Sequence, residues 1–205
     1  MSAFVIALLG AESTGKTDLS RALQNALAAD GKTVAVVGEY LREFCALAGR
    51  TPRSDEQRQI AQAQTLRIAA AAQEHDIVIA DTTALMIAVY SEQVFGDASL
   101  YDAAQNAHRR CDLTLLMALD LPWHPDGVQR DGPQVREPVD ALLRAALARS
   151  GTAFSVVSGQ GAARCDAALA SVRRALAPPD RQARWQWVCE RCSDGECERH
   201  RLLRD

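Results

Sequence analysis

The sequence predicts an α/β fold: a five-stranded, mostly parallel sheet with helices on both faces and a short Cys/His-rich C-terminal tail. Short apolar runs alternate with longer segments of helical composition, which is typical of βα units. A short stretch of small and polar residues joins the first apolar run to the first helical segment. The composition changes after two consecutive prolines, Pro178 and Pro179. We therefore expect one main domain over residues 1–177 and a tail over residues 178–205.

Five apolar runs have the length and composition of buried parallel strands. They are Phe4–Leu9, Thr33–Val37, Ile77–Ala80, Leu113–Leu119 and Ala153–Val157. The segments between them are long enough for crossover helices, so the strands are expected to run parallel. The predicted strand order is 2-3-1-4-5.

Six segments rich in alanine, leucine, arginine and glutamine predict helices. They are Lys16–Ala29, Ser54–Glu74, Ala84–Phe95, Leu100–Arg110, Val139–Arg149 and Ala162–Leu176. Between the fourth strand and the fifth helix, Leu121–Glu137 contains three prolines and two glycines, which predicts a long polar loop.

The overall composition is that of an ordinary globular protein. The chain has 205 residues, of which 48% are hydrophobic and 24% charged, and its formal net charge is -3, so there is no strong nucleic-acid signal. No apolar run approaches the length of a membrane span and no signal-peptide pattern begins the chain, so we expect a cytoplasmic protein with no membrane partner. Cys45, Cys111 and Cys165 are interpreted as small core residues.

The seam after the first strand has the P-loop pattern: glycine, four residues, then Gly-Lys and Ser or Thr. Its residues are Gly10, Ala11, Glu12, Ser13, Thr14, Gly15, Lys16 and Thr17. The glycines let backbone N–H groups point at phosphate oxygens, Lys16 reaches the β- and γ-phosphates, and Thr17 offers a hydroxyl to Mg²⁺. We therefore expect a P-loop NTPase fold that uses ATP and Mg²⁺.

Two acidic residues follow neighbouring strands at the edge where α/β proteins bind ligands. Asp81 ends the strand "IVIAD" and is expected to hold Mg²⁺, although an aspartate before two threonines is also typical of a helix N-cap. Glu39 follows "TVAVVG" and could orient or deprotonate an acceptor hydroxyl. The alternative for Glu39 is a first-turn glutamate that only interacts with the helix dipole.

The long polar loop carries two arginines, Arg130 and Arg136, of the kind that neutralises charge on a transferred phosphoryl group. They could equally be solvated surface arginines. Trp123 begins the same loop, where it could stack on a planar ring or anchor the core.

Four stretches together resemble the NadR-type nicotinamide riboside kinase domain and NadR-like P-loop AAA family ATPases. They are "LLGAESTGKT", "GEYLREF", "IVIADTT" and "PWHPDGVQR", and the resemblance covers Ala3 to Leu176. It implies a P-loop NTPase fold of the nucleoside and nucleotide kinase kind. It also implies transfer of the γ-phosphoryl group of ATP to the 5′-hydroxyl of a ribonucleoside such as nicotinamide riboside. It also implies that Glu39, Tyr40, Arg42 and Trp123 surround the nucleoside and that Asp126 contacts ribose hydroxyls.

The tail contains the pattern Cys189-x-x-Cys192-x-x-x-x-Cys197-x-x-His200. Two closely spaced pairs of such ligands can close a tetrahedral zinc site, whose binding energy would fold a segment that has no core of its own. Unpaired surface thiols and a redox or iron–sulfur site are the alternatives.

Two functions other than a kinase are compatible with a P-loop. The first is an ATP- or GTP-binding regulatory ATPase module that acts through a protein partner, and the second is a catalytically silent ATP binder. They differ from a kinase in lacking an acceptor site for a small molecule.

Overall fold

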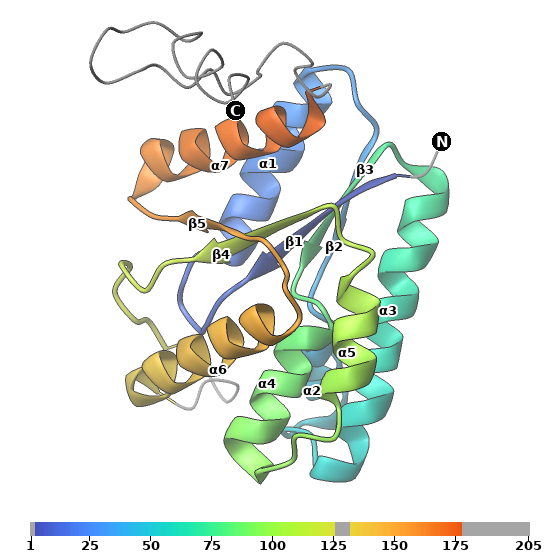
Figure 1. The fold of residues 1–205 in the computed structure, drawn as a ribbon, viewed down its shortest axis with the longest axis vertical. Coiled ribbons are helices and arrows are strands. Elements are labelled where there is room, and N and C mark those ends of the chain that lie inside the picture. The colour runs from blue at the N-terminus through green and yellow to red at the C-terminus, as the bar shows by residue number, and fades with distance from the viewer. Residues whose placement is uncertain (1–2, 126–131, 178–205) are drawn as a thin grey trace, which may run out of the picture.

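A computed structural model describes residues 3–125 and 132–177 of the chain. At its centre lies one five-stranded sheet with the order β2-β3-β1-β4-β5, in which every pairing is parallel (Figure 1). The strands are β1 (Phe4–Leu9), β2 (Val34–Val37), β3 (Ile77–Asp81), β4 (Leu113–Met117) and β5 (Ser155–Val157). The predicted fold class and strand order are confirmed.

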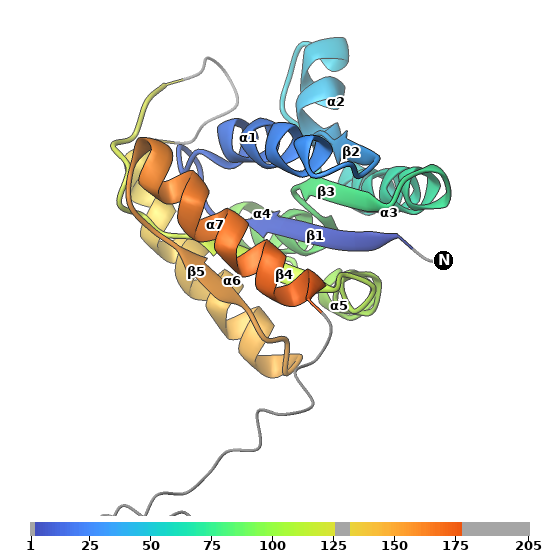
Figure 2. The same cartoon turned by 90° about the horizontal axis from the view of Figure 1, so that it is seen from above.

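Seven α-helices are described, with two short 3₁₀ turns. They are α1 (Lys16–Ala29), α2 (Tyr40–Ala48), α3 (Gln57–Glu74), α4 (Ala84–Phe95), α5 (Tyr101–His108), α6 (Arg136–Arg149) and α7 (Gly161–Leu176), with turns η1 (Ser54–Glu56) and η2 (Pro133–Val135). Helices α1 and α7 cover one face of the sheet, and α3 to α6 lie on the other (Figures 1 and 2). Both faces are therefore buried, as a parallel sheet requires.

Strand β1 is the centre of the core because its side chains alternate between two apolar clusters. Ile6 and Leu8 pack with residues of α1 and α7, whereas Ala7 and Leu9 pack with residues of α4 and α6. All four side chains are completely buried. The segment after Leu9 is consequently held in a fixed position at the carboxyl end of the sheet.

The first half of helix α4 is apolar on all sides, and the helix packs against α3, α5 and α6. Its residues from Ala84 to Val89 are all buried. Despite this composition, no helix in the described parts of the chain is long and apolar enough to cross a bilayer.

The structure differs from the prediction in two helices. Helix α2 was not predicted; it is a nine-residue helix that ends at Gly49, whose φ of 67° is the left-handed conformation that stops a helix. Helix α6 begins at Arg136, three residues before the predicted start at Val139, because Pro133 opens a 3₁₀ turn that leads directly into it.

Candidate functional site

The phosphate loop joins β1 to α1 at the carboxyl end of the sheet. Gly10 has a φ of 152° and Gly15 a φ of 76°, and both are backbone conformations that favour glycine. A Cβ atom on Gly10 would lie 2.8 Å from the Cβ of Met117, and one on Gly15 would lie 3.1 Å from Leu121 Cδ1. Gly10 is therefore required by both conformation and space, and Gly15 by its conformation.

Lys16 is the first residue of α1, and its ammonium group lies over the phosphate loop. Its Nζ donates hydrogen bonds to the carbonyls of Gly10 (2.7 Å) and Ala11 (2.9 Å). Thr14 braces the same loop, because its hydroxyl donates to the Ala11 carbonyl at 2.8 Å. A lysine ammonium group at the N-terminus of a helix, beside the backbone N–H groups of the loop, is an arrangement that attracts phosphate.

Thr17 and Asp81 meet beside the loop. The Thr17 hydroxyl donates a 2.6 Å hydrogen bond to Asp81 Oδ2. Asp81 is 4% exposed, and among the described residues its second oxygen, Oδ1, has no hydrogen-bond partner. A buried carboxylate oxygen without a partner is unfavourable unless a cation or a water molecule binds to it. The Asp81 carboxylate and the Thr17 hydroxyl are oxygen ligands of the kind that Mg²⁺ prefers, so they fit this ion.

The N-cap alternative for Asp81 is wrong. Helix α4 is capped by Thr83, whose hydroxyl accepts a hydrogen bond from the N–H of Leu85 at 3.3 Å. Thr82, between the strand and the cap, has a φ of 88°, which turns the chain away after the carboxylate. Asp81 is left pointing at Thr17.

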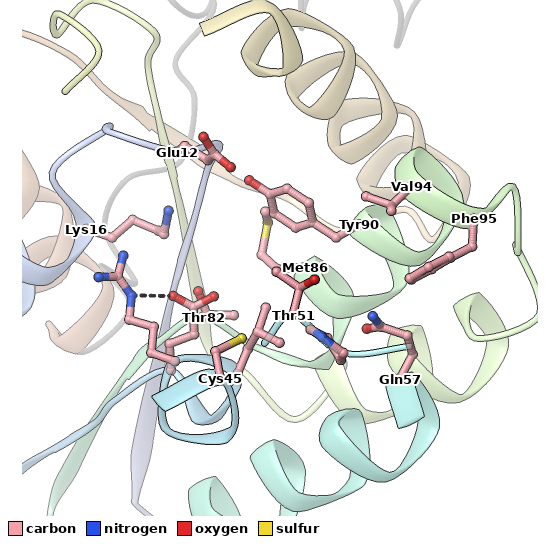
Figure 3. Close-up of a pocket in the computed structure, with 14 residues that line it drawn as sticks. Glu12, Lys16, Cys45, Thr51, Gln57, Thr82, Met86, Tyr90, Val94 and Phe95 are labelled. Atoms are coloured by element: carbon pink, nitrogen blue, oxygen red, sulfur yellow. Dashed lines mark hydrogen bonds and ion pairs between the residues drawn. The ribbon is translucent and has the colours of Figure 1, made fainter. Parts of the chain in front are cut away.

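A pocket of about 190 Å³ opens beside Lys16 and runs between α2 and α4 (Figure 3). The end nearest the phosphate loop carries the charged residues Glu12, Lys16, Glu39 and Arg42. Val94 and Phe95 of α4 lie at the opposite, apolar end, and Met86 and Tyr90 lie between the two ends, with the Tyr90 hydroxyl directed toward Glu12 (Figure 3). Burial raises the pKa of Cys45, which also lines the pocket, so its thiol stays protonated.

Glu39 and Arg42 form an ion pair on the α2 side of this pocket. Arg42 Nε donates to Glu39 Oε2 at 2.9 Å, and the Glu39 side chain is 17% exposed. Glu39 occupies the N-cap position of α2, although its side chain makes no capping hydrogen bond. Its carboxylate is consequently available at the pocket rather than folded back on the helix.

Tyr40 does not line the pocket, contrary to the role that the resemblance implied. Its ring lies under the guanidinium of Arg67, 4.4 Å from the ring centroid, and Gln64 Oε1 accepts a hydrogen bond from its backbone N–H.

Trp123 also lies outside this pocket, over the phosphate loop. Its indole N–H donates to Glu12 Oε2 at 3.4 Å. In the same contact, the Ser13 hydroxyl donates to the carbonyl of His124 and accepts from its N–H, both at 3.0 Å. The start of the predicted loop is therefore tied to the motif itself.

Arg136 is not a loop residue, so the prediction for it is corrected. It is the first residue of α6 and is 9% exposed, and its Nε and Nη2 have no hydrogen-bond partner among the described residues. Asp126, Arg130 and the predicted zinc ligands Cys189, Cys192, Cys197 and His200 lie outside the described residues. Within residues 3–125 and 132–177, no group of three metal-ligand side chains gathers.

Two buried polar residues near the site were not predicted. Gln64 of α3 is completely buried, and its amide donates to the carbonyls of Gly38 and Thr82, which follow β2 and β3. It thus fixes the distance between the segments that carry Glu39 and Asp81. The signal was present, because Gln64 lies four residues after Ile60 and four before Ile68 on the apolar face of the helix.

Arg164 of α7 is the second such residue and is 4% exposed. Its guanidinium donates to Asp120 Oδ1 (2.6 Å), to the Gly159 carbonyl (2.8 Å) and to the Thr14 carbonyl (3.0 Å). Burial acts to raise the pKa of Asp120, but hydrogen bonds from Arg164 and the Gly159 N–H outweigh it and lower the pKa below its usual value. Arg164 therefore connects the phosphate loop to the segments that follow β4 and β5.

A family model described as an AAA domain matches residues 5–164. The chain belongs to this AAA-domain family. The match includes the phosphate loop, Asp81 and Arg164. No curated protein sequence matches the chain.

Solved structures show the same fold. A NadR protein in complex with NAD and AMP-PNP superposes with a TM-score of 0.67 at 20% identity, over 87% of this chain and 51% of that one. A NadR protein in complex with NR has a TM-score of 0.68 at 19% identity, over 84% of this chain and 49% of that one. A thymidylate kinase from Ehrlichia chaffeensis has a TM-score of 0.61 at 16% identity, over 86% of this chain and 100% of that one. The chain spans about half the length of the NadR chains, and the resemblance to the NadR type is confirmed for the fold.

Proposed function

We propose that the protein is an ATP- and Mg²⁺-dependent kinase that phosphorylates a small-molecule hydroxyl, namely the 5′-hydroxyl of a ribonucleoside such as nicotinamide riboside. The observation that carries this proposal is the pocket between α2 and α4, which begins at Lys16 and Glu39. A nucleotide-binding loop alone needs no such compartment, whereas a kinase needs one for its acceptor.

The structural neighbours support the same class. NadR proteins were solved with NR and with an ATP analogue, and the third neighbour is named a thymidylate kinase. These proteins share a fold with this chain at 16 to 20% identity, so the substrate itself is argued from the pocket.

In the proposed reaction, the acceptor oxygen attacks the γ-phosphorus, the bond to the β,γ-bridging oxygen breaks and ADP leaves. Glu39 accepts the proton of the acceptor hydroxyl and passes it to solvent. Lys16, released from the carbonyls of Gly10 and Ala11, follows the charge that develops on the phosphoryl oxygens. Arg42 holds the Glu39 carboxylate toward the pocket.

Thr17 and Asp81 would hold Mg²⁺, because they place a hydroxyl and an unpartnered carboxylate oxygen beside the phosphate loop. When bound, the ion neutralises negative charge on the β- and γ-phosphates. Trp123 and Ser13 hold the segment after β4 against the loop, which limits the access of water to the phosphates.

A nucleoside panel tests the proposal. Purified protein with ATP and Mg²⁺ is expected to form ADP only when a nucleoside is added, together with an equal amount of the nucleoside monophosphate, measured by chromatography. Glu39→Gln is expected to lower nucleoside-dependent turnover by about 100-fold, the scale of general-base catalysis, and to leave ATP binding unchanged. ADP formation that is indifferent to every nucleoside but stimulated by a protein partner would instead favour the regulatory ATPase.

A further inference from the structure

The apolar end of the acceptor pocket contains one buried polar side chain, Gln57. It is the first residue of α3, it is 4% exposed, and it lines the pocket with Val94 and Phe95 (Figure 3). Among the described residues, no hydrogen bond is found for its carboxamide. Gln57 is therefore a buried amide whose open side is the pocket.

A ligand that displaces water from this amide must supply partners for both its donor and its acceptor, because an amide buried without partners is costly. A glutamine amide has an N–H₂ donor and a C=O acceptor side by side, so its complement is a ligand edge that also carries one donor and one acceptor. The carboxamide of nicotinamide and the lactam edge of uracil have this pattern.

The remainder of this end suits a flat ring. Phe95 is 40% exposed and Val94 52% exposed, which is unusual for large apolar side chains and leaves their surfaces open to a ligand. Met86, 2% exposed, forms part of the wall. An aromatic face beside a single polar group is typical of sites that recognise a heterocyclic base.

The two ends of the pocket determine how a nucleoside would be oriented in it. Lys16 lies at one end of the pocket and Gln57 at the other (Figure 3), and Glu39 is also part of the lining. A ribonucleoside with its 5′-hydroxyl at Glu39 would direct its base toward α4 and Gln57.

We propose that Gln57 determines base specificity: it selects nucleosides whose base presents a hydrogen-bond donor and acceptor on one edge. This inference rests on the proposed kinase function and names the substrate class of the same pocket. It predicts that bases without such an edge are poor acceptors even when they fit the apolar end, since they leave the amide unpaired.

The test compares matched nucleosides. Nicotinamide riboside is paired with the pyridine riboside that lacks the carboxamide, and uridine with 3-methyluridine, which lacks the N3 donor. For each pair, kcat and KM are measured with wild type, Gln57→Leu and Gln57→Met. We expect wild type to prefer the amide-bearing member by at least about tenfold in kcat/KM, and both variants to reduce this preference to within about twofold.

Gln59→Leu is the matched control, because Gln59 is exposed on the same turn of α3. It is expected to keep the wild-type preference, and thermal unfolding and the KM for ATP check that all variants are folded. A Gln57 variant that lowers kcat/KM equally for both members of each pair would overturn the inference, since the residue would then only support the structure. If wild type phosphorylates none of the nucleosides, the proposed function itself fails, and the inference fails with it.

Discussion

At the scale of single residues, Asp81 carries the strongest chemical signal, because one oxygen of its carboxylate is bonded to Thr17 and the other is buried without a partner. We predict that Asp81→Asn lowers Mg²⁺-dependent turnover of ATP by about 100-fold or more, since a neutral amide is a poor ligand for a hard cation. Turnover against Mg²⁺ concentration measures the effect. Asp18→Asn, which changes an exposed aspartate in the first turn of α1, should behave as wild type.

Arg164 acts on the phosphate loop from a distance in sequence of 150 residues. We predict that Arg164→Gln raises the KM for ATP by about tenfold and changes kcat by less than about threefold, because the residue positions the Thr14 carbonyl and touches no reacting atom. Steady-state kinetics at saturating nucleoside separate the two constants. The KM of Arg164→Lys for ATP should fall between those of wild type and Arg164→Gln. Arg174→Gln, on the exposed side of α7, should have no effect on either constant. A loss confined to kcat would contradict the positioning role.

The residues of the phosphate loop could be predicted from the sequence because each has a fixed chemical task at a fixed spacing. Gln64 and Arg164 were not predicted, since their tasks depend on which carbonyls the folded chain brings near them. A polar residue on the buried face of a helix signals such a role but not its partner. Tyr40 is a different case. A motif predicted its position in the sequence, but not the direction of its ring, which faces Arg67.

At the scale of elements, α4, α5 and β4 are joined by one buried histidine. His108 Nδ1 lies 3.2 Å from the Thr83 hydroxyl and its Nε2 lies 3.0 Å from the Thr114 hydroxyl. Burial lowers the pKa of His108 to about 4. The neutral imidazole is thus part of the packing between these elements.

The lowered pKa of His108 makes the free energy of unfolding depend on pH. Because the unfolded chain has a histidine pKa near 6.5, it binds the proton more readily than the folded chain between about pH 6.5 and pH 4, so stability decreases as the pH falls through that window. We predict a loss of about 2 kcal/mol of unfolding free energy between pH 7 and pH 5 from this group. Urea unfolding at the two pH values measures it.

His108→Gln keeps a hydrogen-bonding side chain but cannot be protonated in this range, so it should remove that part of the pH dependence. His75→Gln, at the end of α3, is the matched control and should retain it. Equal slopes in wild type and His108→Gln would show that the buried ring does not carry the effect.

The strands could be predicted because a doubly covered sheet requires continuous apolar runs. Helix α2 could not be identified with equal ease. It has only nine residues, and its helical spacing depends on three apolar side chains, Leu41, Phe44 and Cys45, which are too few to distinguish a short helix from a loop. The first residue of α6 was missed because Pro133 was interpreted as part of a loop, whereas it begins a helical turn.

At the scale of the whole molecule, nucleotide binding should be visible as stability. At 100 times its Kd, Mg·ATP stabilises the folded state by about 2.7 kcal/mol. We predict a rise of about 5 to 10 °C in the melting temperature of wild type and none for Lys16→Ala at the same concentration. Lys32 is the only other lysine in the sequence and is exposed, so Lys32→Ala is the matched control and should keep the full shift. A shift that survives in Lys16→Ala would place the nucleotide elsewhere.

The boundary at residue 178 and the zinc site of the tail stay predictions. Metal analysis of protein purified without added zinc tests the site, with about one equivalent expected if Cys189, Cys192, Cys197 and His200 bind the ion together.

The position of β1 in the sheet also bears on how the molecule is made. Both of its neighbours, β3 and β4, lie later in the chain, from residue 77 and residue 113 onward. A nascent polypeptide that has emerged only as far as α3 holds the complete Gly-Lys motif but neither of the strands that flank it. The ability to bind ATP must therefore arise only after β4 has left the ribosome, although the residues that bind the phosphates are translated before either neighbouring strand.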